Sequence, residues 1–160
     1  MPSERTEDYL ESLAQVIDEK GFAKVKDIAE NLSVSPSSVT EMFQKLRKNG
    51  YINYEKYRGV TLTEKGLTIA MKTKKRHDTL REFLCILGVP ELIANEDACR
   101  IEHVVNNETM KRLTTFVNFV RDFEESPKWL NHFKHYYSTG KHFSCKKFGN
   151  KDTNATNEIL

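Results

Sequence analysis

The sequence is poor in the residues that define several protein classes. It has three cysteines in 160 residues, Cys85, Cys99 and Cys145. The count is odd, and there is no Cys-x-x-Cys pair and no secretory leader, which argues against a disulfide-stapled extracellular domain. No apolar run approaches the roughly 20 residues needed to cross a bilayer, so no membrane partner is expected. We expect a soluble, cytoplasmic protein of one or two small domains.

Acidic residues are scarce in the middle of the chain. Between positions 36 and 76 there are ten Lys and Arg residues, three Glu and no Asp. The formal net charge of +2 hides this bias, because residues 1–20 and 91–125 lean acidic. A local excess of positive charge favours a polyanionic partner.

Two helices joined by a tight turn are predicted in and just before this basic segment. Residues 24–32 carry apolar side chains at helical spacing, and Ser35 with Pro36 is a favoured start for a second helix that stops at Gly50. Small hydroxyl residues open the second helix and let a phosphate approach. The pattern indicates a helix-turn-helix, although an ordinary helical hairpin has the same spacing. The side chains expected to face DNA are Ser37, Ser38, Thr40, Gln44 and Lys45.

A β-hairpin is predicted directly after the second of these helices. Residues 51–54 and 60–62 are short β-prone runs around the tip EKYRG, where Gly59 is available for a positive φ. Lys56 and Arg58 are expected to point outward. A basic hairpin after a recognition helix is typical of a wing, which adds salt-dependent phosphate contacts.

Two further helices carry isolated polar residues. The first, from about Glu4 to Lys20, is capped by Ser3 or Thr6 and ends at Gly21. It leaves Asp8 and Glu11 on its outer side, where ordinary solvation is the simple interpretation.

A long helix from Thr63 to Gly88 is predicted to connect two domains, with the boundary near Met71. His77 lies at the edge of its apolar stripe, where lone histidines are commonly structural.

The stretch from Asn95 to Asn106 brings three possible metal ligands together. Cys99, Glu102 and His103 stand at i, i+3 and i+4, so on a helix capped by Asn95 they share one arc, opposite an apolar arc that docks to a core. We expect sulfur, oxygen and nitrogen donors on the free face, a ligand mix that suits a divalent transition metal. A solvated face that carries a cysteine is the alternative.

The apolar residues near the end of the chain indicate self-association. Residues 108–125 form a helix with a wide apolar face, which suits a homodimer with Phe116 and Val120 as anchors, although an intrachain core would use the same face. A final helix covers residues 128–137, and the polar run from Ser138 is expected to be mobile. A second metal site is not expected, because its candidate donors match no ligand spacing. They are His135, His142 and Cys145.

Together these motifs resemble the DtxR/MntR family of metal-dependent transcriptional repressors over about residues 4–137. The motifs are SPSSVTEMFQKL in the second helix of the pair, YEKYRG in the hairpin, KRH around His77 and IEH at 101–103. The resemblance implies a mainly α fold. We expect a winged helix-turn-helix DNA-binding domain at 1–71, an all-α metal-binding and dimerisation domain at 72–137 and a tail at 138–160, without the SH3-like domain of larger members.

The resemblance also implies a metal site where three helices meet. Position 99 departs from the manganese-responsive branch, which has a bridging carboxylate there, and Cys99 matches the iron-responsive branch; that branch has a thioether in place of Asp8. Arg81 replaces a carboxylate of the iron branch's ancillary site. This hybrid set predicts Fe²⁺ first and Mn²⁺ next, with Co²⁺, Ni²⁺ and Zn²⁺ also possible. The expected ligands are Asp8, Glu11, His77, Cys99, Glu102 and His103.

The predicted function is that of a dimeric repressor that binds a palindromic operator in double-stranded DNA when metal is present and so controls metal homeostasis. Two alternatives remain: a metal-independent winged-helix regulator that senses another ligand, and a metalloenzyme. An enzyme is not expected, because no nucleophile motif or catalytic cleft is evident.

Overall fold

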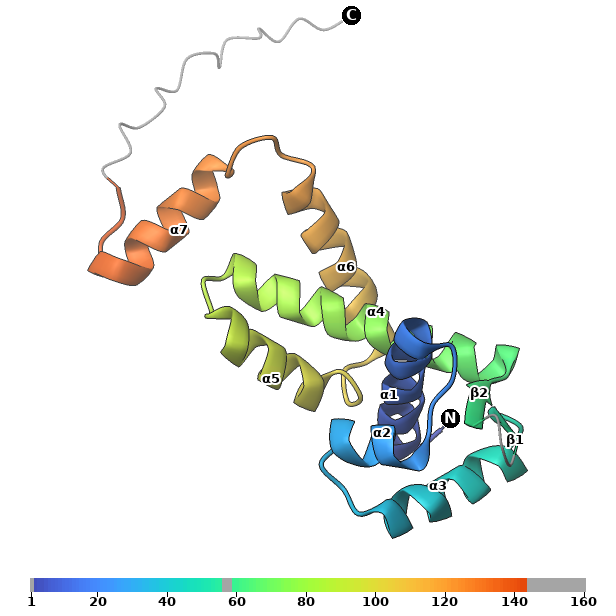
Figure 1. Ribbon diagram of the computed structural model, residues 1–160. Coiled ribbons are helices and arrows are strands. Elements are labelled where there is room, and N and C mark those ends of the chain that lie inside the picture. Colours follow the sequence, from blue (N-terminus) through green and yellow to red (C-terminus); the bar gives the residue numbers. More distant parts are fainter. Residues whose placement is uncertain (1, 56–58, 144–160) are drawn as a thin grey trace, which may run out of the picture. The chain divides into compact units, whose positions relative to one another are not determined.

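Helix α1, Glu4–Lys20, lies at the centre of the first half of the fold (Figure 1). The computed structural model describes residues 2–55 and 59–143, so the predicted positions of Lys56, Arg58 and Cys145 lie outside the described residues. Leu10 and Leu13 of α1 are fully buried, and Gly21 ends the helix with φ 79°. The predicted bounds of this helix are confirmed.

The helix-turn-helix pair consists of α2, Val25–Asn31, and α3, Pro36–Lys48. The Ser35 hydroxyl accepts a hydrogen bond from the backbone N–H of Ser38 at 3.2 Å, which caps α3 as predicted. Asp27 caps α2 by accepting from the Lys24 backbone N–H at 2.8 Å and also pairs with Lys20. The apolar sides of both helices join α1 in one core. Its fully buried members include Leu10, Leu13, Ile28, Val39, Leu46 and Val60.

The wing is a two-stranded antiparallel hairpin of β1, Ile52–Glu55, and β2, Gly59–Leu62. Gly59 has φ 88°, and an added Cβ would lie 2.8 Å from the Ala23 carbonyl oxygen. Glycine is therefore required here by both backbone conformation and space. The approach allows Val60 and Ala23 to exchange two backbone hydrogen bonds of 2.8 and 2.9 Å, which fasten the wing to the segment between α1 and α2.

Helix α4, Glu64–Ile86, runs without a break from the wing into the second half of the fold. The Thr63 hydroxyl caps it by accepting from the backbone N–H of Gly66. It packs against α1, and against α5, Glu91–Ile101, and a smaller core forms between α4, α5 and α6, Asn107–Arg121. This core is centred on Leu80, Ala98 and Met110. The mainly α fold with a winged helix-turn-helix is confirmed.

One predicted helix boundary is wrong. Asn95 is not the N-cap of the helix that bears Cys99, because α5 begins four residues earlier at Glu91, directly after Pro90. Pro90 lacks a backbone N–H and has an extended backbone, with ψ 140°, which suits the residue before a first helical turn. Asn95 therefore lies inside α5 and its side chain is free to contact His77.

The described residues from Phe119 onward form a second compact unit. It contains α7, Lys128–Thr139, which ends at Gly140 with φ 67°. The helix thus includes Ser138 and Thr139, which the sequence analysis assigned to the tail. Within residues 2–55 and 59–143, no helix is both long enough and apolar enough to cross a membrane.

Candidate metal centre

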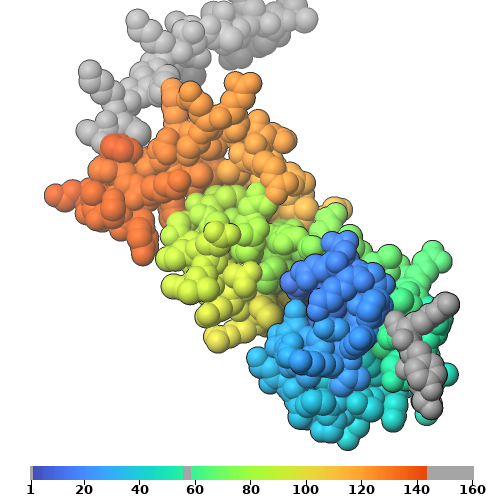
Figure 2. Space-filling view, viewed as in Figure 1, coloured from blue at the N-terminus to red at the C-terminus, as the bar shows by residue number. Residues whose placement is uncertain are grey.

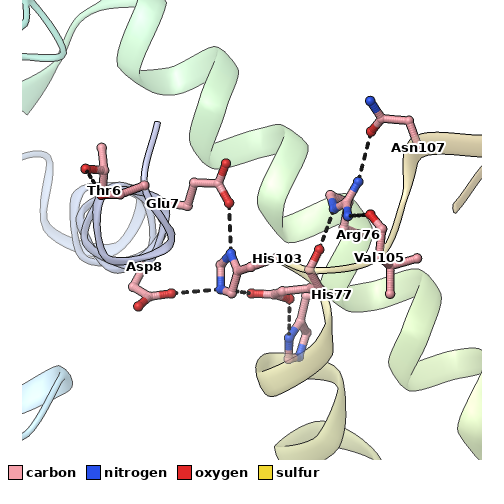
Figure 3. A network of polar contacts seen from close by, with 10 residues as sticks. Thr6, Glu7, Asp8, Arg76, His77, His103, Val105 and Asn107 are labelled. Atoms are coloured by element: carbon pink, nitrogen blue, oxygen red, sulfur yellow. Dashed lines mark hydrogen bonds and ion pairs between the residues drawn. The ribbon is translucent and has the colours of Figure 1, made fainter. Parts of the chain in front are cut away.

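Three side chains from distant parts of the sequence meet beside α4. Asp8 comes from α1, while Glu102 caps the C-terminus of α5 and His103 follows it. One ligand atom from each lies within 4.8 Å of the others, and the group combines two carboxylates with an imidazole. Figure 3 shows Asp8 and His103 pointing toward one another. Oxygen and nitrogen donors at this separation are suited to a divalent cation.

Two buried atoms in this group lack hydrogen-bond partners among the described residues. The His103 Nε2 atom lies 2.9 Å from Asp8 Oδ1 and 3.3 Å from Glu102 Oε1, yet neither contact has the geometry of a hydrogen bond. Glu102 Oε1 is likewise buried without a hydrogen-bond partner in the described part of the chain. Buried polar atoms normally find hydrogen-bond partners, whereas these two atoms meet only in ion-pair contacts between His103 Nε2 and the carboxylates. A cation bound by both would satisfy them, and the residues present therefore fit a metal.

The carboxylates of the site are hard to ionise. Glu102 is only 1% exposed, and burial, together with the nearby charges of Glu11 and Asp8, raises its pKa to about 8 despite the opposing effect of His103 and Arg76. Burial also raises the pKa values of Asp8 and Glu11. For His103, burial by itself lowers the pKa, but the hydrogen bond to Glu7 and the charges of Asp8 and Glu102 reverse this and leave it raised. Without a cation, the site therefore favours bound protons.

His77 occupies the edge of the cluster. Its Nδ1 lies 3.0 Å from Glu102 Oε2, and its Nε2 lies 3.0 Å from Asn95 Oδ1. Glu11 is close enough for the charges of His77 and His103 to oppose the rise in its pKa. Neither His77 nor Glu11 belongs to the close trio of Asp8, Glu102 and His103.

Cys99 lies outside the trio and is exposed. The pKa of its thiol is raised, first because the residue is partly desolvated and then because of the negative charges of Glu102, Asp8 and Glu11. The thiolate is therefore disfavoured there without a cation. The predicted free face of donors is wrong for two of the three residues: the side chains of Glu102 and His103 are buried, and only Cys99 is exposed. Glu102, the C-cap of α5, keeps helical backbone angles and therefore lies on the same buried face as Ala94 and Ala98.

Arg76 is a structural residue of this site that sequence reasoning missed. Its Nε donates to the Glu102 carbonyl oxygen at 2.7 Å, its terminal nitrogens donate to the Val105 carbonyl and to Asn107 Oδ1, and it thereby fastens the turn between α5 and α6 (Figure 3). In the sequence, Arg76 is one of several basic residues of the connector. No periodicity distinguishes a residue that binds backbone 26 positions away.

Replacing Arg76 by Ala is expected to lower both stability and metal affinity. The change removes three hydrogen bonds from a charged donor, so we expect the free energy of unfolding to fall by about 2 kcal/mol. The turn that carries Glu102 and His103 would then be less well ordered. Urea denaturation and metal titration measure the two effects, with the exposed neighbour Lys75→Ala as control. Equal metal affinity in the Arg76→Ala and Lys75→Ala variants would contradict the expected role of Arg76.

The predicted DNA-facing residues differ in their surroundings. Ser37, Thr40, Gln44 and Lys45 are exposed on α3, which lies at the surface beside α1 and α2 (Figure 2). Ser38 is half-buried, and its hydroxyl lies 2.9 Å from the Ser35 hydroxyl at the helix cap. Gln44 also borders a depression of about 270 Å³ between α3 and the wing. The other residues that line it are Val25, Thr40, Phe43, Arg47 and Tyr54.

Comparison with known families agrees with both halves of the fold. Residues 1–60 match the model of the iron dependent repressor N-terminal DNA binding domain, and residues 63–129 match that of the iron dependent repressor metal binding and dimerisation domain. The chain belongs to the iron-dependent repressor family. The resemblance to DtxR/MntR regulators that the sequence motifs indicated is thereby confirmed.

Solved structures of similar proteins include several metal-dependent regulators. The manganese regulator SloR is 30% identical, with 71% of this chain matched to 54% of SloR at a TM-score of 0.64. IdeR from T. acidophilum is 26% identical, over 70% of this chain and 53% of IdeR, with a TM-score of 0.64. ScaR with bound Zn²⁺ is 30% identical, over 74% of this chain and 55% of ScaR, with a TM-score of 0.61. This iron-dependent repressor family member thus spans about half the length of these relatives.

Proposed function

We propose that this protein is a metal-dependent transcriptional repressor whose DNA binding requires a divalent cation at the Asp8, Glu102 and His103 site. The observation that carries the proposal is the pair of buried atoms on Glu102 and His103 that face Asp8 and lack hydrogen-bond partners in the described part of the chain. Asp8 lies on the central helix of the domain that bears α3, while the other two residues belong to the metal-binding half. The site therefore joins the DNA-binding elements to the rest of the chain.

The residues of the site couple metal binding to DNA binding through α1. Arg76 holds the turn that carries Glu102 and His103, and α1 holds Asp8 opposite them. A bound divalent cation would supply the positive charge that these clustered carboxylates lack. Because Leu10 and Leu13 bury α1 in the same core as α3, fixing α1 also fixes α3. The coupling is reciprocal, so DNA binding strengthens metal binding by the same factor.

We further propose that α3 enters the major groove and that the protein acts as a homodimer on a palindromic operator. Two recognition helices about 34 Å apart would reach successive major grooves. We expect the dimer contacts on α6 and the end of α4, with Phe116 and Val120 as anchors; within one chain, Phe116 packs edge to face on Phe83 with ring centroids 5.7 Å apart. The proposed DNA-binding residues are Ser37, Ser38, Thr40, Gln44, Lys45, Lys56 and Arg58.

Fe²⁺ is the proposed physiological metal, with Mn²⁺ next. Oxygen ligands from Asp8 and Glu102 suit either ion, and a thiolate from Cys99 favours Fe²⁺ over Mn²⁺. SloR is described as a manganese regulator, and ScaR has been solved with Zn²⁺, so related proteins accept several divalent ions. In this proposal Cys99, Glu11 and His77 complete the coordination around the close trio.

The decisive experiment compares DNA retardation under chelator and under Fe²⁺ or Mn²⁺, without oxygen, for the wild type and for Cys99→Ser and Cys99→Glu variants. We expect DNA binding only with metal, a weaker Fe²⁺ response in Cys99→Ser because the soft ligand is lost, and a Mn²⁺ stoichiometry closer to two in Cys99→Glu because a carboxylate bridges two ions. An unchanged Fe²⁺ response in Cys99→Ser would exclude the thiolate as a ligand. Specific DNA binding that is indifferent to chelator would instead favour a metal-independent regulator.

A further inference from the structure

The two ring nitrogens of His103 have different surroundings. Nδ1 lies 2.8 Å from Glu7 Oε2 in a hydrogen bond, whereas Nε2 faces Asp8 and Glu102 without one in the described part of the chain. An ionised carboxylate only accepts hydrogen bonds, so the Nδ1 atom must carry the hydrogen that is shared with Glu7. In the neutral ring this leaves the lone pair on Nε2, the atom that is turned toward the other two members of the trio.

We propose that Glu7 is a positioning residue for the metal site: it holds the His103 ring in the Nδ1–H tautomer and orients Nε2 as the metal-binding atom. The inference rests on the proposed function, because it concerns the same site. It adds a residue that the donor pattern did not include. A carboxylate that accepts from the second nitrogen of a ligating histidine fixes the ring and makes the bound nitrogen more basic.

The position of Glu7 in α1 makes it suited to this role. Glu7 and Asp8 are consecutive, so one helical turn presents a carboxylate to each nitrogen of the same ring (Figure 3). The turn is itself held by hydrogen bonds from the backbone N–H groups of Thr6 and Glu7 to the Ser3 carbonyl oxygen, at 2.8 and 3.1 Å. The His103 side chain is 5% exposed, so its orientation is set by these contacts and not by solvent.

A cavity lies beside Glu7, so no other protein group is in place to accept the hydrogen bond from His103 Nδ1 among the described residues. Glu7 and His103 both border a space of about 330 Å³, which is also lined by Lys72, Thr73 and Arg76. If the Glu7 carboxylate were removed, Nδ1 would face this space, and water would replace a fixed charged acceptor. The ring would then lose both its preferred tautomer and the group that orients it.

Metal titration of the full-length protein tests the proposal. We expect Glu7→Ala to weaken Mn²⁺ binding by roughly 10- to 100-fold, the usual cost of losing such a partner. Glu7→Gln should recover most of the affinity, because its amide oxygen still accepts from Nδ1–H. The matched control is Glu4→Ala, which removes an exposed carboxylate from the same end of α1. The control measures the loss of a carboxylate charge alone, because Glu4 is exposed and acts on Asp8 only through its charge; its effect should be well below that of Glu7→Ala.

Nitrogen NMR of the histidine rings in the Zn²⁺-loaded wild type gives a readout that a purely structural role would not produce. We expect His103 to show a protonated Nδ1 and a metal-bound Nε2. The reverse assignment would overturn the proposal, and it does so even if Glu7→Ala fails to fold. Unchanged Mn²⁺ affinity in a folded Glu7→Ala protein, with affinity lost in His103→Ala, would also overturn it while leaving the proposed function intact. Retention of metal-dependent DNA binding in His103→Ala would instead reject the proposed function.

Discussion

Replacing Glu102 by Gln is expected to stabilise the metal-free protein and to abolish its metal-dependent DNA binding. The folded protein holds the Glu102 pKa at about 8, above its ordinary value of 4.5. At neutral pH this carboxyl therefore opposes folding by up to about 3 kcal/mol, because the unfolded chain releases the proton and the folded chain retains it. An amide of the same shape avoids that cost but lacks the negative charge that a cation requires.

Chemical denaturation under chelator and DNA retardation with Mn²⁺ measure the two halves of this prediction. The amide oxygen that Glu102→Gln introduces can still accept a hydrogen bond from His77, so the variant should fold. Glu96→Gln, at an exposed position of the same helix α5, is the control and should change neither property. A Glu102→Gln protein that is less stable than the wild type at neutral pH would show that the carboxylate does not oppose folding.

The second large effect is expected from pH. Glu102 has a pKa of about 8, so in the metal-free protein at neutral pH it retains a proton that metal binding must displace, and the raised pKa of His103 acts in the same direction. Affinity should therefore rise by about tenfold per pH unit well below pH 8 and less steeply near it, which from Glu102 is roughly 50-fold between about pH 6 and pH 8. The free energy of unfolding of the metal-free protein should instead fall as the pH rises. Because the folded pKa values exceed the unfolded ones, stability from these groups is greatest at low pH and is lost as pH rises toward about 8.

Competition between the protein and a fluorescent chelator for Mn²⁺ measures the first trend, and thermal unfolding under chelator measures the second. Saturating Mn²⁺ should remove most of the loss of stability at high pH, because a bound cation replaces the displaced protons. An Mn²⁺ affinity that does not change with pH would mean that Glu102 and His103 are already deprotonated in the metal-free protein.

Local sequence patterns predicted the elements of the fold closely. The first helix, the Ser35 cap, the positive φ at Gly59 and the Thr63 cap all depend on residues a few positions apart. The wrong cap at Asn95 has the same local origin: asparagine and proline both precede helices, and only the contacts of α5 with α4 show which one begins it. The burial of Glu102 was also mispredicted, because the face of α5 that packs inward is the one with Ala94, Ala98 and Glu102, and only the tertiary contacts decide which face that is.

The metal donors were predictable as types and in part as positions. The spacing of Cys99, Glu102 and His103 indicated a metal, and the family resemblance added Asp8, Glu11 and His77. The sequence could not show that Asp8, Glu102 and His103 form a close trio while the other predicted ligands lie farther out. That division depends on how α1, α4 and α5 pack. The same limit applies to Glu7, which contacts His103 across 96 positions of sequence.

The sequence by itself determined the helices, the wing and the family of this protein, because caps, turns and apolar periodicity act over a few residues. Only the tertiary structure decided which polar groups are buried and which atoms face one another. Burial and close approach set the raised pKa of Glu102, the different surroundings of the two His103 nitrogens and the hydrogen bonds of Arg76 to the turn. All three depend on polar and charged groups from segments distant in sequence, which come close only after the hydrophobic cores have brought α1, α4 and α5 together.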